Sequence, residues 1–284
     1  MQPLLTCSPK QLPLEKIVDA AKTATSINPL NHPPLHRLGR VMRDFISTPE
    51  RIAVLTTKYW GLKGVSLTVG FLDNPPADLR KRILLHMNAW AKTANVKFAQ
   101  TANPANAHVR IARVVGGETG GYWSYLGTDI LHIPKDQPTM NLEAFSMSVQ
   151  ESEYHRVVRH ETGHTLGFPH EHMRKALVDK IDPTKAIAFF MQTQGWSEEE
   201  VREQVLTPIE ESTLKGTTPD PKSIMCYQIP GSITKDGKPI IGGLDIDVSD
   251  YNFAKLIYPK KVGAPEKPPK VVAKPATKAA KAGQ

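Results

Sequence analysis

The sequence predicts an α+β fold, and three patterns favour this class. Between Gly64 and Phe71, apolar residues alternate with smaller or polar ones, which indicates a half-buried strand. A stripe of apolar residues at helical spacing follows, and short strand-like runs come after it. One strand, one long helix and more strands are typical of an α/β or α+β half-domain. Beyond Gly167 the pattern changes to short helices and turns.

The first elements lie in a region that prolines interrupt. Residues 12–24 and 35–46 can each form a helix, and no active-site motif lies there. The strand at 65–71 ends before a pair of prolines, and we expect the next helix to bury one face in the core. That face consists of Leu79, Ile83, Met87 and Trp90.

Glycines and capping residues divide the rest of the chain. We expect strands at 109–111 and 130–133, with the Gly-rich stretch 116–121 turning between them. Residues 151–166 should form a second long helix, which Gly167 ends in a left-handed conformation. Capping signals predict three further helices, which begin after Asp182, after Ser197 and after Asp247 or Ser249.

The composition is that of a globular protein. With 284 residues, 40% of them hydrophobic and 23% charged, the chain can bury a core. No apolar run is long enough to span a bilayer, and the N-terminus has no conventional secretion signal. The sequence therefore leaves open a cytoplasmic location and export by another route. Two distant cysteines, Cys7 and Cys226, provide no disulfide framework.

The formal charge of +8 is concentrated at one end of the chain. Residues 260–284 contain seven Lys and a single Glu, so the rest of the protein is nearly neutral. We expect this Lys-, Pro- and Ala-rich tail to be solvated and unstructured, and binding to an anionic surface is the alternative. A nucleic-acid-binding protein should also be basic outside its tail, so we expect no nucleic-acid partner.

The strongest functional signal is the motif HExxHxxGxxH, which begins at His160. His160 and His164 lie one turn apart on a helix, so both imidazoles can bind one Zn²⁺. Glu161 lies beside them, where it can reach a water molecule without binding the metal. Gly167 lets the chain leave the helix sharply, and the returning chain brings His170 to the ion as third ligand. Three protein ligands leave a position open, as catalytic zinc requires.

The other histidines carry no comparable signal. We expect six of them to be packed or surface residues: His32, His36, His86, His108, His132 and His155. His172 lies near the motif, but its spacing gives it no ligand role.

At this motif the sequence resembles the metzincin clan and, more narrowly, the astacin family of zinc endopeptidases. Residues 223–227, Ser-Ile-Met-Cys-Tyr, resemble the Met-turn of that family, with Cys226 in place of a His; its side chain should not touch the metal. The resemblance implies that Met225 packs under the zinc site. It also implies that Tyr227 is a switchable ligand that moves to the scissile carbonyl oxygen. Glu171, directly after the third His, fits the family as well.

A third stretch, residues 120–127, resembles the segment that forms the upper rim of the cleft in astacins. It implies an edge strand that pairs with an extended substrate, with Trp123, Ser124 and Tyr125 as substrate-binding residues. The resemblance covers residues 58 to about 259 and implies a two-lobed metzincin-like domain. Its upper lobe would hold a twisted mixed sheet and the long active-site helix, and its lower lobe would be mainly irregular and helical.

The sequence departs from the family in its disulfides and its latency signal. Tyr122 stands where the family has a Cys, and the other expected cysteines are missing. The Phe-x-Gly-Asp switch of the family's pro-segment is absent as well, so any latency mechanism must differ. We expect residues 1 to about 51 to restrain the enzyme until they are cut off or displaced on activation, and a cut near Arg51 would let the new amino group at Ile52 reach a buried Glu171. A permanent structural arm is the alternative.

Together these features predict a zinc-dependent metalloendopeptidase with one Zn²⁺ per chain and protein or peptide substrates. Glu161 would carry the proton, and Tyr227 would stabilise the oxyanion. The alternative is a zinc-bearing, catalytically weak peptide-binding module, which has no need of Glu161. We expect a monomer with an N-terminal extension at 1–57, a possible pro-segment, followed by a catalytic domain at 58–259 and the tail at 260–284.

Overall fold

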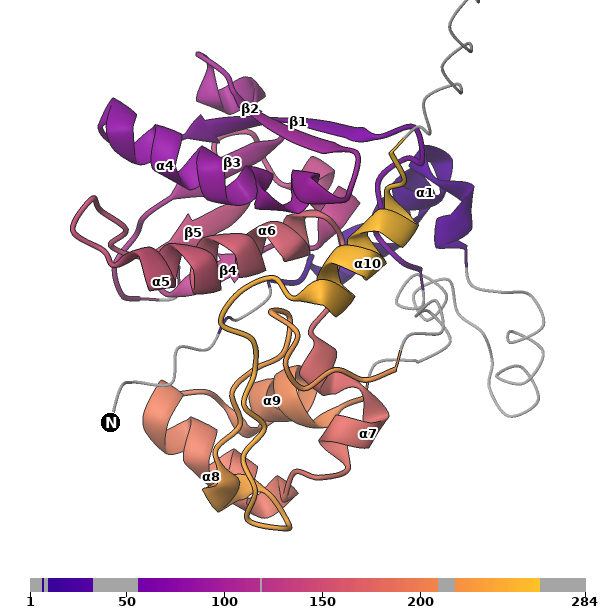
Figure 1. Cartoon of the computed structure of the whole chain (residues 1–284), viewed down its shortest axis with the longest axis vertical. Helices are drawn as coiled ribbons and strands as arrows, with labels where there is room; N and C mark the ends of the chain where they lie inside the picture. Colours follow the sequence, from indigo (N-terminus) through magenta and orange to yellow (C-terminus); the bar gives the residue numbers. More distant parts are fainter. Residues whose placement is uncertain (1–6, 8–9, 33–55, 118, 209–217, 261–284) are drawn as a thin grey trace, which may run out of the picture.

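The computed structural model describes residues 7, 10–32, 56–117, 119–208 and 218–260. These residues form two lobes, with the sheet in the upper lobe and helices and loops in the lower one (Figure 1). The predicted helix at 35–46 and nearly all of the tail lie outside the described residues. None of the helices in the described part of the chain is long and apolar enough to cross a bilayer.

The upper lobe is built on a five-stranded mixed sheet in the order β2-β1-β3-β5-β4. The strands are β1 (Val65–Phe71), β2 (Val96–Gln100), β3 (Val109–Ala112), β4 (Tyr122–Ser124) and β5 (Met140–Leu142). Neighbouring strands are parallel except β4, which runs antiparallel to β5 and forms one edge. The predicted strands at 65–71 and 109–111 are confirmed, and so is an edge strand within 120–127.

Two helices lie side by side in front of the sheet (Figure 1). The first is α4 (Ala77–Met87), which continues as the 3₁₀ turn η2 (Asn88–Lys92). Its predicted apolar face is fully buried in the main core. The second is one continuous helix made of α5 (Glu151–Glu153), the π-helical turn η5 (Tyr154–Val158) and α6 (Arg159–Thr165). It matches the predicted helix at 151–166, and its widened turn directly precedes the metal motif, a common position for π-turns.

The predicted strand at 130–133 is wrong, because these residues belong to the 3₁₀ helix η4 (Gly127–His132) and its end. Ile130 and Ile133 are both buried, as the apolar pattern suggested. They lie three positions apart, and residues at that spacing share one face of a 3₁₀ helix. Gly127 starts the turn with a positive φ of 48°, and the next strand of the sheet is β5 instead.

The lower lobe consists of short helices around a separate apolar cluster. They are α7 (Lys175–Val178), α8 (Pro183–Gln194), α9 (Glu198–Val201) and the π-helical turn η7 (Arg202–Leu206). Two predicted caps are confirmed, since the Asp182 side chain accepts from the Lys185 amide and Ser197 forms a capping box with Glu200. Within the described ranges of both lobes, short 3₁₀ helices also lie in the connections: η1 (Pro29–Asn31), η3 (Pro104–Asn106), η6 (Glu171–Met173) and η9 (Gly231–Ile233).

The last helix, α10 (Val248–Ile257), returns from the lower lobe to the upper one (Figure 1). Asp247 caps it in a capping box with Asp250, which confirms the predicted start. Its buried Ala254 and Ile257 join the main core together with Tyr258. The chain after α10 thus closes the upper lobe.

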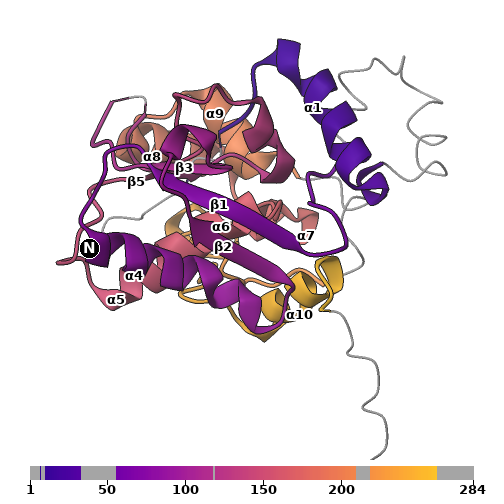
Figure 2. The ribbon, with the colours of Figure 1, turned by 90° about the horizontal axis from the view of Figure 1, so that it is seen from above.

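The N-terminal helix α1 (Leu14–Ile27) confirms the helix predicted at 12–24, shifted by a few residues. Seen from above, α1 and α4 lie on opposite sides of β1 (Figure 2). Ala20 of α1 packs with Leu12 and Ile133 in a small apolar cluster beside η4. The helix is therefore attached to the same part of the upper lobe that carries β4.

Candidate metal centre

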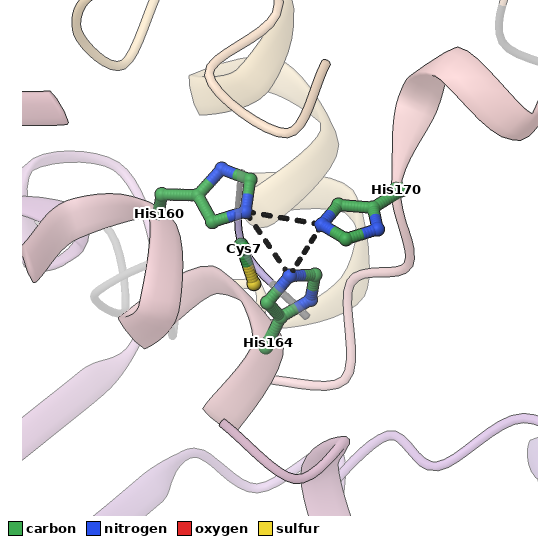
Figure 3. A group of neighbouring side chains, drawn as sticks. All are labelled: Cys7, His160, His164 and His170. Carbon is green, nitrogen blue, oxygen red and sulfur yellow. Dashed lines mark hydrogen bonds between the residues drawn. The ribbon is translucent and has the colours of Figure 1, made fainter. Parts of the chain in front are cut away.

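Three histidines converge between the lobes (Figure 3). His160 and His164 come from α6, and His170 lies where the chain enters the lower lobe. Their Nε2 atoms are 3.0 to 3.2 Å apart, and all three side chains are buried. Nitrogens bound tetrahedrally to one Zn²⁺ at 2.0–2.1 Å would lie about 3.3 Å apart, so the spacing fits one ion.

Hydrogen bonds at the opposite ring nitrogens fix the orientation of two of these rings. His160 Nδ1 lies 2.6 Å from the Ile224 carbonyl oxygen, and His164 Nδ1 lies 2.8 Å from that of Phe168. A carbonyl can only accept, so Nδ1 carries the proton and the Nε2 lone pair points to the centre. Burial also lowers the pKa of all three histidines, which favours the neutral ring that binds metal. The donor set therefore fits zinc.

The turn after α6 explains how His170 reaches its partners. Gly167 has a φ of 91°, as predicted, and a β-carbon at this position would lie only 3.0 Å from the Lys58 carbonyl oxygen. The Phe168 amide donates back to the Gly163 carbonyl, which closes the end of the helix. The Trp60 indole also donates to the Thr165 carbonyl, which fixes this end of α6 to the segment that precedes β1.

Residues 223–226 form a tight turn below the histidines, where the predicted Met-turn lies. The Cys226 amide donates to the Ser223 carbonyl. Asp250 of α10 accepts from the Ser223 hydroxyl at 2.6 Å and from the Ile224 amide at 2.9 Å. Met225 is buried, and its sulfur lies close to Gly163 of α6. Because Ile224 also accepts from His160, the turn positions a predicted ligand directly.

Glu161 lies beside the three histidines and is 1% exposed. One of its carboxylate oxygens, Oε2, has no hydrogen-bond partner among the described residues. Burial raises the pKa of Glu161 to about 8, although a hydrogen bond with Cys7 opposes the shift. A buried carboxylate with a free oxygen beside a cation site can accept a proton from a water molecule there.

Tyr227 follows the turn and reaches the same centre from below. Its ring centroid lies 4.2 Å from that of His170 and 4.0 Å from that of His172. The hydroxyl is buried without a hydrogen-bond partner among the described residues. His172 binds the Gln204 carbonyl through Nε2 and does not join the triangle of ligands, as its spacing predicted.

Comparison of the sequence with models of known protein families identifies the family of this chain. The model described as Astacin, a peptidase family, matches residues 56–241. The chain belongs to the astacin family.

Known relatives agree with this assignment. Zinc metalloproteinase nas-27 of Caenorhabditis elegans is 30% identical over 129 residues, which are 45% of this chain and 27% of that protein. The chain thus matches about a quarter of the length of that astacin. Two solved structures of myroilysin are each 27% identical and cover 72% of this chain. The matches include 97% and 86% of the two myroilysin chains, with TM-scores of 0.66 and 0.55. They confirm the metzincin-like α+β fold.

In this astacin the predicted substrate residues lie in β4 or directly after it, and they differ in burial. Ser124 is fully buried, and its hydroxyl lies 3.2 Å from that of Thr165 in α6. Trp123 is also buried and donates to the Thr119 carbonyl, whereas Tyr125 is half-buried. Their predicted role in substrate binding stays a prediction, and a peptide that paired with this edge would meet its backbone.

Glu171 lies in the lower half of the astacin site, away from the metal ligands' ring nitrogens. Its carboxylate accepts from the Asp220 amide at 3.0 Å and lies 3.4 Å from the Arg174 guanidinium. Burial raises its pKa to about 7. A cavity of about 290 Å³ adjoins it, with Asp250 in the wall. The structure thus shows room beside Glu171, and its predicted pairing with a new N-terminus at Ile52 stays a prediction, because residue 52 lies outside the described residues.

Cys7 is a residue of this astacin site that sequence reasoning missed. Its Sγ and the ring nitrogens of His160, His164 and His170 all lie within 4.8 Å of one another. Figure 3 shows the thiol beside the triangle of histidines. No motif surrounds Cys7, and its place depends on strand pairing between distant segments, so no signal in the sequence could have found it.

Proposed function

We propose that this protein is a zinc-dependent metalloendopeptidase that hydrolyses internal bonds of proteins or peptides. The observation that carries the proposal is the triangle of three histidine Nε2 atoms that face one another, with the buried Glu161 beside it. His160, His164 and His170 would hold one Zn²⁺ per chain. When bound, zinc would acidify a water molecule and polarise the substrate carbonyl.

The residues around the ion would supply the proton transfers and the oxyanion contact. Glu161 accepts the proton of the attacking water and delivers it to the leaving amine. The Tyr227 hydroxyl, which has no partner among the described residues, donates to the carbonyl oxygen as negative charge develops there. The β4 edge pairs with the substrate backbone, so an extended peptide is the substrate class that this surface suits.

The proposal divides the chain into three parts. Residues 58–259 would form the catalytic domain, which is compatible with the family match to 56–241. Residues 1–57 would be an N-terminal extension and 260–284 a tail that catalysis does not need. We propose a monomer, since one chain supplies every residue that the mechanism uses.

The test is hydrolysis of a diverse peptide pool by zinc-loaded protein, with and without a chelator, followed by sequencing of the products. Because Cys7 lies at the histidine triangle, both the parent and a Cys7→Ser variant are assayed. Glu161→Gln serves as the matched control, since it keeps the shape of the side chain and all metal ligands. Internal cleavage that the chelator and the control variant both abolish supports the proposal.

A zinc-bearing peptide-binding module is the competing function. It predicts that the parent, Cys7→Ser and Glu161→Gln proteins all bind zinc and peptides and that none of them cleaves. That result would replace the proposed hydrolysis by binding.

A further inference from the structure

We propose that the N-terminal arm, residue 7 and residues 10–32, is an inhibitor built into the chain, with the Cys7 thiolate as a fourth zinc ligand and α1 as its anchor. The inference rests on the proposed function and adds its regulation. It replaces an undefined N-terminal restraint with a named ligand and a named attachment.

The four ligand atoms have the chemistry of a closed zinc site. Cys7 is 5% exposed, and its Sγ is grouped with three inward-facing nitrogens. A thiolate is a strong zinc ligand, and three nitrogens with one sulfur make a closed tetrahedral set. Closed sets are typical of structural zinc, since they leave no position for water. The same three histidines thus form an open site without Cys7 and a closed site with it.

The arm also occupies the edge strand. Cys7 pairs with Tyr122 and Lys10 with Tyr125, both in a parallel sense, so the arm runs along β4. The Lys10 ammonium also lies 5.5 Å from the centre of the Trp123 ring. A substrate that pairs with β4 would need the same backbone groups. The arm therefore competes at the strand edge as well as at the metal.

Little space is left beside the catalytic groups. A small pocket of about 30 Å³ is lined by Cys7 together with Tyr122, His160, Glu161 and Tyr227. That volume suffices for about one or two water molecules and excludes a peptide. Cys7 also packs into the apolar cluster of the lower lobe, next to Tyr227 and Cys226. The arm thus bridges both lobes across the site.

The anchor explains why the thiol stays in place. Beyond the packing of Ala20 near η4, Thr23 Oγ1 of α1 lies 2.9 Å from His132 Nε2. After the helix, two buried amides bond to the chain that leads into β1. Asn28 donates to the Trp60 carbonyl, and Asn31 donates to the Tyr59 carbonyl and accepts from its amide, each at 2.8 to 3.0 Å. A ligand tethered to a helix that is fixed in this way has a high effective concentration at the metal.

Opening and closing is a ligand exchange without redox chemistry. On closing, the Cys7 thiol loses its proton to solvent, the sulfur–zinc bond forms and a water molecule leaves. On opening, the bond breaks, water enters and the thiolate takes up a proton. Release would uncover Glu161 and Tyr227 at the same time, because both line the small pocket beside Cys7.

The decisive measurement is the absorption spectrum of the full-length chain loaded with Co²⁺ in place of zinc. We expect near-ultraviolet thiolate-to-cobalt charge transfer in the parent and its loss in Cys7→Ser. Cys226→Ser is the matched control, since Cys226 is the other buried cysteine and lies outside the group of metal ligands, and it should keep the band. Identical spectra of the parent and Cys7→Ser would overturn the proposal.

The anchor is tested with Cys7 left intact. Ala20→Arg places a charge in the buried contact of α1, whereas Leu14→Arg changes a residue of the same helix that is 78% exposed. We expect Ala20→Arg to lose the charge-transfer band and to expose Cys7 to a maleimide label, while Leu14→Arg resembles the parent. If both arginine variants keep the band, α1 is not the anchor.

Peptide hydrolysis separates this inference from the proposed function. At equal zinc content we expect Cys7→Ser to cleave about a hundredfold faster than the parent, the lower range for losing a tethered competitor. Equal rates in the two proteins would refute inhibition and leave the protease assignment intact. A thiolate band in the parent with no cleavage by either protein would refute the protease assignment and leave Cys7 as a ligand.

Discussion

Gly163, in the middle of the metal motif, shows how one missing side chain positions the site. A β-carbon at this position would overlap the sulfur of Met225 and lie 3.3 Å from the Trp90 ring. Gly163 therefore lets α6 approach the turn that holds His160 through Ile224. The motif leaves this position unspecified, so the requirement arises from packing in this fold.

Gly163→Ala should consequently destabilise the protein, although Ala is the better helix former by about 1 kcal/mol. Overpacking of this kind typically costs about 1–3 kcal/mol, which exceeds the gain in helix propensity. Thermal unfolding of the zinc-loaded proteins measures the difference. The double variant Gly163→Ala/Met225→Ala is the control, because removal of the sulfur should make the added methyl group less costly.

Tyr227 offers a second test at the scale of single residues. Tyr227→Phe removes only the hydroxyl, so fold and zinc content should be unchanged while kcat falls. Loss of one oxyanion donor typically costs about 10²–10³ in kcat. The comparison uses a Cys7→Ser background so that the arm does not limit the rate. A kcat equal to that of the background protein would exclude the oxyanion role.

Among the elements, α10 stabilises the turn below the histidines, and its sequence pattern does not indicate this contact. Its third residue, Asp250, completes the capping box with Asp247 and at the same time fixes the turn at Ser223 and Ile224. The cap was predictable, because both partners lie within one turn of the helix. The contact with the turn was not, since it joins segments that only the tertiary fold brings together.

Asp250→Ala should weaken both the helix and the metal centre. It removes the acceptor of three donors, and leaving buried donors unpaired costs about 1–3 kcal/mol each. We expect a lower melting temperature together with weaker zinc retention during dialysis. Asp179→Ala, at a mostly exposed surface ion pair, is the comparison and should change neither.

The same distinction explains how much of the structure could be predicted. Local signals placed β1, the face of α4, the caps of α8 and α9 and the left-handed Gly167. They failed where two structures share one pattern, as at η4 and its end, where the buried Ile130 and Ile133 suit a strand or a 3₁₀ turn equally well. The metal triangle was predictable because all three histidines lie within eleven residues of one motif. Cys7 was not, since its position results from pairing with β4.

At the scale of the whole molecule, the centre joins the two lobes. His160 and His164 belong to α6 of the upper lobe, whereas His170 lies directly before η6, where the chain enters the lower lobe. A bound ion therefore adds a connection between lobes that no disulfide supplies, since both cysteines are free. The stability of the molecule should depend on its metal.

Removal of zinc should lower the melting temperature of the full-length chain. A ligand at a hundred times its Kd stabilises the native state by about 2.7 kcal/mol, and this contribution disappears with the ion. Calorimetry with and without a chelator measures the shift. In a Cys7→Ser background, where the thiol cannot replace the lost ligand, His170→Ala should show little further change on chelation, and a large chelator effect in that double variant would argue against His170 as a ligand.

The attachment of α1 has a consequence for any cut in the chain between the arm and β1. The Ala20 contact and the two buried asparagines hold the arm without help from the peptide backbone after residue 32. A chain nicked between residues 33 and 55 should therefore run as two bands on a denaturing gel yet elute as one particle from a sizing column. Separation of the fragments on that column would show that the covalent link, rather than packing, retains the arm.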